Sequence, residues 1–149
     1  MVPDTEVVSR FKVPATLDAI GAIQAAVEEA AEGVLAPAAV FKLTMSIEEL
    51  VTNIVTYGKA EGTDIGVVIT AGIASLSVEL DDAGVAFDPF HQAPEPRLNQ
   101  SVEDRAVGGL GVFLVREMVD EVAYHRSAER NHIRLVMLRP TAKSDGTAP

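Results

Sequence analysis

Apolar side chains recur every three or four residues between positions 40 and 54, which predicts a helix with one buried face. The positions that set this period are Val40, Leu43, Ile47, Leu50, Val51 and Ile54. Pro37 is typical of a first helical turn and Gly58 of a helix end, so the predicted helix lies between them. Glu49 and Asn53 are one turn apart on the side away from the apolar face, so a carboxylate and a carboxamide project together.

The side of this helix that faces away from the core carries a single formal charge. Its residues are Met45, Ser46, Glu49, Thr52, Asn53 and Thr56. A helix face in water usually carries several charged side chains. The face is therefore either a solvated polar surface, which the helix taken alone slightly favours, or a second covered surface such as a pocket wall.

The rest of the chain contains five predicted strands, at residues 6–13, 64–71, 74–80, 121–126 and 132–138. One further helix is expected to begin after Thr16, as its N-cap, and to end at Gly33, and another begins at Gly109 or Leu110. Residues 81–88 are predicted to form a turn. Residues 89–107 are polar, with three prolines and no periodicity, and are predicted to form a long loop of the kind that serves as a lid or linker.

This order of elements predicts an α+β fold, a two-layer sandwich in which helices cover one face of a mixed, mostly antiparallel sheet. Residues 1–140 are expected to form a single domain. Residues 141–149 are small and polar and are expected to form a flexible tail.

Composition narrows the class of protein. A chain of 149 residues with 48% hydrophobic content is expected to be one folded globular domain. It has no apolar run of the roughly 18 residues that cross a membrane, and its first residues lack the pattern of a signal peptide, so a cytoplasmic protein is expected. The absence of cysteine excludes disulfides and thiolate metal sites.

The net charge of −10 and the lack of a basic cluster argue against a nucleic-acid partner. For the same reason, any bound phosphate would have to be held by backbone N–H groups, a helix N-terminus or a metal ion, because lysines are too few.

Three segments are candidates for chemistry: Glu49 with Asn53, residues 82–89 with Asp82 and Gly84, and residues 108–111. Asp82 and Gly84 could form a plain turn, since aspartate bonds locally and glycine accepts positive φ. The glycines at 108, 109 and 111 could serve loop flexibility, or they could expose helix N–H groups to phosphate. No Walker lysine follows them, and the spacing does not fit a dinucleotide fingerprint.

Taken together, these segments resemble the N, G1 and G2 boxes of the GHKL (Bergerat) ATP-binding fold shared by gyrase, histidine kinases and MutL. Within that superfamily the chain is most similar to the anti-sigma-factor serine/threonine kinases of bacterial partner-switching systems. The resemblance covers about residues 6–138 and rests on the three boxes and on residues 87–89, 103–105, 108–115 and 120–124.

The resemblance implies roles for individual residues. Asn53 would ligate Mg²⁺ at the ATP phosphates, and Glu49 would be the general base. Asp82 would accept a hydrogen bond from the adenine amino group, and Gly84 would let the backbone approach the base. The glycine-rich segment would wrap the phosphates; its members are Gly108, Gly109, Leu110 and Gly111.

Other positions are open or depart from the family pattern. Two interpretations of Arg105 carry equal weight: a contact to the γ-phosphate, and a solvated loop arginine. Ala86 stands where the Asp-x-Gly-x-Gly box usually has its second glycine. His91, His125 and His132 do not lie on an N-terminal helical hairpin, so they are interpreted as ordinary surface or strand residues and not as phospho-acceptors.

Two classes of function follow from the resemblance. In the first, which the intact Glu49 favours, the protein phosphorylates a serine or threonine of a STAS-domain antagonist and sequesters a sigma factor or other output protein. In the second, ATP or ADP occupancy orders the 89–107 segment and selects the partner without significant phosphotransfer. ATP hydrolysis without a protein partner is a weaker third option. The family also implies a homodimer.

Overall fold

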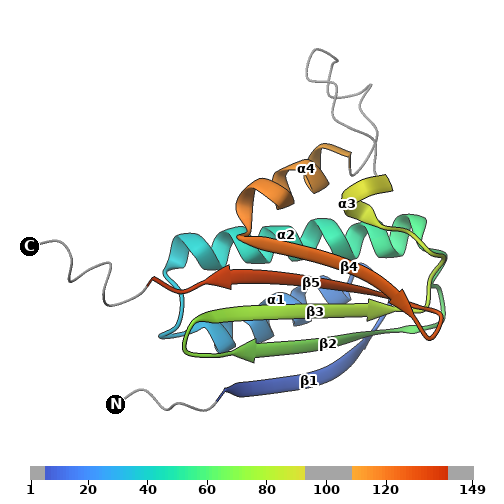
Figure 1. Ribbon diagram of the computed structural model, residues 1–149. Coiled ribbons are helices and arrows are strands. Elements are labelled where there is room, and N and C mark those ends of the chain that lie inside the picture. Colours follow the sequence, from blue (N-terminus) through green and yellow to red (C-terminus); the bar gives the residue numbers. More distant parts are fainter. Residues whose placement is uncertain (1–5, 93–108, 141–149) are drawn as a thin grey trace, which may run out of the picture.

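The computed structural model describes residues 6–92 and 109–140, which form an α+β fold with helices on one side of a five-stranded sheet (Figure 1). The strands are β1 (Val7–Pro14), β2 (Asp64–Ala71), β3 (Ser75–Asp82), β4 (Glu121–Ser127) and β5 (Arg130–Leu138). The helices are α1 (Ala19–Ala31), α2 (Pro37–Tyr57), α3 (Pro89–Gln92) and α4 (Gly109–Met118).

The sheet has the strand order β1-β2-β3-β5-β4, and every neighbouring pair is antiparallel. The two edges are therefore β1 and β4. The register of β3 against β5 places Asp82 opposite Asn131 at the end of the sheet where β3 leads into the candidate turn. The predicted two-layer α+β architecture is confirmed.

The core lies between the sheet and the helices. Alternate residues of the three central strands point into it and are buried, as period-two patterning requires: Ile65, Val67, Ile69, Leu76, Val78, Leu80, Ile133, Leu135 and Met137. Helix α2 packs against both α1 and α4 and contributes its predicted apolar face. Five of the six periodic residues of that face are buried, and Val40 is partly buried against the same core.

Some predicted boundaries were wrong. Helix α1 starts at Ala19 with Asp18 at the N-cap position, because residues 16–19 form a tight turn in which the Ala19 N–H donates to the Thr16 carbonyl. Asp81 and Asp82 belong to β3, since they pair with β5, and the turn begins after them.

The start of the predicted long loop is helical. Pro89 begins the short helix α3, and the Asp88 carboxylate accepts the Phe90 N–H at 2.9 Å. This is the usual arrangement of an aspartate cap followed by proline in the first turn. Residues 93–107 of the predicted loop, and the predicted tail, lie outside the described residues. In the part of the chain that the structure describes, no helix is long and apolar enough to span a membrane.

Candidate functional site

The middle of α2 presents Glu49 and Asn53 on a surface that the fold covers. Asn53 is only 5% exposed and Glu49 is half-buried. Of the two interpretations of this polar helix face, the covered surface is therefore correct for these two residues, while Met45 and Thr56 are exposed. The sequence pattern could not decide this, because the pocket that Asn53 lines is completed by residues distant in the sequence, such as Asp82 and Asn131.

Both side chains carry a buried oxygen atom without a partner. In the described part of the chain, Glu49 Oε2 and Asn53 Oδ1 are the buried side-chain atoms that make no hydrogen bond. A buried acceptor without a partner costs about 1–3 kcal/mol, so folded proteins rarely keep one without a functional reason. Two such acceptors one helical turn apart indicate a place for a cation or hydrogen-bond donor.

The environment of Glu49 favours its neutral form. Desolvation by burial raises the pKa of Glu49 above its ordinary value, a hydrogen bond from the Asn53 side chain opposes the shift, and the neighbouring Glu48 adds to it. A carboxylate with a raised pKa is a better proton acceptor at neutral pH than an ordinary glutamate.

A second polar group lies at the end of β3. Asp82 is 2% exposed, and its Oδ1 accepts the Gly84 N–H at 2.8 Å and the Asn131 Nδ2–H at 3.1 Å. Its other carboxylate oxygen accepts no hydrogen bond from the described residues. Asp82 therefore has one oxygen fixed by the protein and one available to a ligand.

Gly84 brings the turn after β3 against the C-terminus of α2. A Cβ at Gly84 would lie 2.4 Å from the Gly58 carbonyl oxygen, which no backbone could accommodate without moving. The next residue, Val85, donates its N–H to the same carbonyl at 2.8 Å. Glycine is thus required here for contact between backbone segments.

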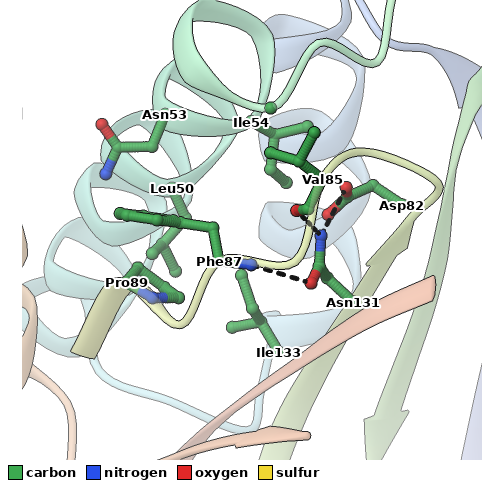
Figure 2. Close-up of a pocket in the computed structure, with 10 residues that line it drawn as sticks. Leu50, Asn53, Ile54, Asp82, Val85, Phe87, Pro89, Asn131 and Ile133 are labelled. Carbon is green, nitrogen blue, oxygen red and sulfur yellow. Dashed lines mark hydrogen bonds between the residues drawn. The ribbon is translucent and has the colours of Figure 1, made fainter. Parts of the chain in front are cut away.

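Asn53 and Asp82 line one pocket that is partly open to solvent, and Glu49 lies outside its lining. The space of about 300 Å³ between its walls includes open solvent. Figure 2 shows Asn53 of α2 at one side of it and Asp82 with Asn131 at the other. The remaining lining is mainly apolar and comprises Leu50, Ile54, Gly58, Val85, Phe87, Pro89 and Ile133. Apolar walls with a few placed polar groups are typical of small-molecule sites.

Asn131 was missed by sequence reasoning. It is 3% exposed on β5 and contacts Asp82 and the turn that follows it. One signal was available: the period of Ile133 and Leu135, continued backwards, places a polar asparagine on the buried face of the strand. Such a residue needs partners.

The glycine-rich segment is only partly described. Helix α4 begins at Gly109, as predicted, so Gly109, Leu110 and Gly111 lie in its first turn. The Arg116 side chain of this helix donates to the Phe90 carbonyl at 3.1 Å and so joins α4 to α3. Gly108 and Arg105 lie outside the described residues, and the structure does not place them near the pocket or away from it.

The donor set at Glu49 and Asn53 fits a hard divalent cation, because both free atoms are oxygens. No group of three or more His, Cys, Asp or Glu side chains within residues 6–92 and 109–140 could hold a metal ion by itself. A cation here would take its other ligands from water or from a bound phosphate, which is the usual way in which Mg²⁺ is held.

This chain is similar to proteins of known class. Residues 13–137 match the family described as histidine kinase-like ATPase domain. The chain is 32% identical over 97 residues to serine/threonine-protein kinase BtrW of Bordetella bronchiseptica, covering 64% of this chain and 68% of BtrW.

A solved structure has the same fold. The crystal structure of the RsbU and RsbW domains of Rv1364c from Mycobacterium tuberculosis matches 91% of this chain with a TM-score of 0.62 and 19% identity. This chain spans about a third of that protein, since the match covers 34% of it. At this identity the likeness concerns the fold alone.

Proposed function

Because the chain belongs to the histidine kinase-like ATPase domain family, and to the group of serine/threonine-protein kinases that includes BtrW, we propose that it is an ATP-dependent kinase of protein serine or threonine. Family membership supports kinase or ATPase activity in general. The observation that carries the proposal is the pair of buried, unpartnered oxygen atoms on Glu49 and Asn53.

The pocket suits the adenine end of ATP. Its apolar walls, among them Leu50, Ile54 and Ile133, offer contact to a flat ring, and the free oxygen of Asp82 offers an acceptor at its edge. An acceptor at that position favours the 6-amino group of adenine over the 6-oxo group of guanine. We assign base recognition to Asp82, with Gly84 shaping the turn.

Asn53 lies on the α2 side of this pocket, and Glu49 lies one turn before it. Asn53 Oδ1 and Glu49 Oε2 would face the phosphate end of the nucleotide. Mg²⁺ bound there through Asn53 would neutralise phosphate charge during transfer. We assign the remaining phosphate contacts to the backbone of Gly108, Gly109, Leu110 and Gly111, and Arg105 stays a candidate for the γ-phosphate.

Glu49 would act as the general base. The acceptor hydroxyl oxygen forms a bond to the γ-phosphorus, the bond from that phosphorus to the ADP oxygen breaks, and the hydroxyl proton passes to Glu49 Oε2. The raised pKa of Glu49 suits this role, because it increases the proton affinity of the carboxylate.

By analogy with the family, the protein acceptor would be a STAS-domain anti-sigma factor antagonist, and the output a sequestered sigma factor or equivalent protein. We further propose that residues 1–140 act as one domain, that the protein is a homodimer, that it works in the cytoplasm, and that it takes part in transcription regulation without contacting nucleic acid. The net charge of −10 is consistent with protein partners and not with DNA.

The experiment has two arms. In the first, isothermal titration measures binding of ATP with Mg²⁺ and of ATP with EDTA to wild type, Asn53→Ala and the neighbouring control Glu48→Gln. We expect Mg²⁺-dependent binding that Asn53→Ala loses and Glu48→Gln keeps, because Glu48 is exposed and outside the pocket. An absence of ATP binding by wild type would overturn the proposal.

In the second arm, radiolabelled ATP is supplied with STAS-domain proteins encoded in the same genome. Wild type and Glu48→Gln should label an antagonist, and Glu49→Gln should bind ATP but not transfer phosphate. A different result would favour the non-catalytic switch. In that case wild type binds ATP, and its affinity for a protein partner depends on the bound nucleotide, but no antagonist is labelled.

A further inference from the structure

We propose that Asn131 is a positioning residue that clamps the turn after β3 in the shape that aims Asp82 at a bound base. This inference rests on the proposed function, because it concerns the same nucleotide pocket. It assigns a role to the β4–β5 hairpin, from which Asn131 and its supporting side chains come.

Asn131 uses all its polar capacity inside the protein. Its Nδ2 group donates to Asp82 Oδ1 at 3.1 Å and to the Val85 carbonyl at 2.9 Å. Its Oδ1 accepts from the Phe87 N–H at 3.3 Å, the Tyr124 hydroxyl at 2.5 Å and Arg126 Nη1 at 3.1 Å.

A carboxamide has two N–H donors and two acceptor lone pairs. Both donors of Asn131 are in use, and three donors already share its oxygen. The side chain therefore has no polar group left for a ligand, even though it lines the pocket. Any effect on the nucleotide must pass through Asp82 and the turn.

The Asn131 side chain forms hydrogen bonds to the turn at three places. It fixes the carboxylate of Asp82, the carbonyl of Val85 and the N–H of Phe87, and Figure 2 shows these three bonds converging on Asn131. Arg126 adds a fourth point, since its Nη1 also donates to the Gly84 carbonyl at 2.9 Å. The turn is thus held from the hairpin side, while Gly58 holds it from the α2 side.

The test compares ATP with the triphosphate of purine riboside, which lacks the 6-amino group, by titration against wild type and Asn131→Ala. Wild type should prefer ATP by at least about tenfold, the value of one hydrogen bond to a charged acceptor. With the turn released, Asn131→Ala should bind ATP more weakly and reduce this preference to within about threefold.

Two further variants separate positioning from general stability. Val136 is buried in β5 and does not line the pocket, and Val136→Ala removes its two methyl groups. This variant should lower the unfolding free energy and leave the preference for ATP over the purine riboside triphosphate unchanged. Tyr124→Phe removes one donor to Asn131 and keeps the ring, so it should fold normally and show a smaller loss of preference in the same direction.

Amide hydrogen exchange of the free protein supplies a readout without nucleotide. The Phe87 N–H should exchange at least about tenfold faster in Asn131→Ala, because it loses its acceptor. The Gly72 N–H, which binds the Ser75 carbonyl in the distant β2–β3 turn, should not change.

The outcomes are distinguishable. If wild type prefers ATP and Asn131→Ala keeps that preference, or if Phe87 exchange is unchanged, the positioning role is wrong and the kinase proposal stands. If wild type binds neither triphosphate, the proposed function fails and this inference fails with it.

Discussion

The two sides of the pocket differ in whether their buried polar atoms have hydrogen-bond partners. On the α2 side, Asn53 Oδ1 is buried without a hydrogen-bond partner, and so is Glu49 Oε2 one helical turn before it, outside the pocket lining. On the opposite side, Asp82 Oδ1 has two partners and Asn131 has five. Unpaired buried oxygens lower the stability of the free protein, whereas a satisfied network holds one geometry.

This difference suggests a division of labour between the two sides. The turn after β3 is already held in one conformation by hydrogen bonds in the free protein. It can therefore select a base by shape and through the one free carboxylate oxygen of Asp82. The α2 side becomes satisfied only when a cation or donor binds Glu49 and Asn53, so it couples stability to occupancy.

The largest effect is expected from Glu49→Gln. Removing a general base lowers phosphotransfer by about 10²–10⁴-fold, while the isosteric amide should leave ATP binding within about threefold of wild type. Single-turnover transfer of radiolabel measures the first and titration the second. Equal transfer rates for Glu49→Gln and wild type would show that another group accepts the proton.

A large effect on stability is expected from Gly84→Ala. The added Cβ would meet the Gly58 carbonyl at 2.4 Å, and that oxygen is backbone, so the turn or the end of α2 must move. We expect a loss of about 2–4 kcal/mol in unfolding free energy, measured with urea, together with weaker ATP binding.

Gly21→Ala is the matched control for that change. Gly21 lies in α1, and nothing lies within 4 Å of a Cβ placed there. Alanine at this helical position should raise the unfolding free energy by up to about 1 kcal/mol. If both variants were destabilised equally, crowding at Gly58 would not be the cause at Gly84.

Much of the fold and part of this site could be predicted from the sequence. The helix period of α2 and the alternation in the strands arise from local chemistry, so the elements and the α+β class followed from them. The same logic placed Glu49 and Asn53 together, because one helical turn brings such residues side by side.

What could not be predicted depends on contacts between distant segments. The five partners of Asn131 come from β3, the turn after it and β4, so no local window contains the network. The need for Gly84 arises from Gly58, which lies 26 positions earlier (84 minus 58). Asp88 followed by Pro89 is a local pattern typical of a helix start. The three prolines within residues 89–107 nevertheless led to the prediction of a loop from Pro89 onwards.

A smaller effect, and a stabilising one, is expected from substitutions at the tip of the β4–β5 hairpin. This hairpin carries Asn131 and so belongs to the Asp82 side of the pocket. Ala128 and Glu129 have φ values of 53° and 62°, a conformation that two-residue hairpin loops usually assign to Asn-Gly. Left-handed backbone costs a non-glycine residue about 1–2 kcal/mol. The double variant Ala128→Asn, Glu129→Gly should therefore raise the unfolding free energy by about 1–2 kcal/mol.

ATP affinity should stay unchanged in that double variant, because Arg126 bonds the backbone carbonyl of Glu129 and not its side chain. A loss of affinity with a gain of stability would mean that strain at the tip helps to place Asn131, which would link the hairpin conformation to the pocket.

The smallest effect concerns the α2 side and depends on pH. Burial raises the pKa of Glu49 in the folded protein above its value in the unfolded chain, so folding disfavours the ionised form. The unfolding free energy is therefore highest, with respect to this group, below the pKa of the unfolded chain, and it falls as pH rises through the raised pKa of Glu49.

Glutamine does not titrate, so Glu49→Gln should be more stable than wild type at pH 7, and the difference should shrink as the pH is lowered below that pKa. The gain is expected to be modest because Glu49 is only half-buried. Urea unfolding across this pH range measures it, with the exposed α1 residue Glu28, changed to Gln, as the control for charge removal. A constant difference at all pH values would mean that glutamine stabilises by packing and hydrogen bonding. In that case the unpaired carboxylate oxygen would carry no penalty, and the contrast between the two sides of the pocket would rest on Asn53 alone.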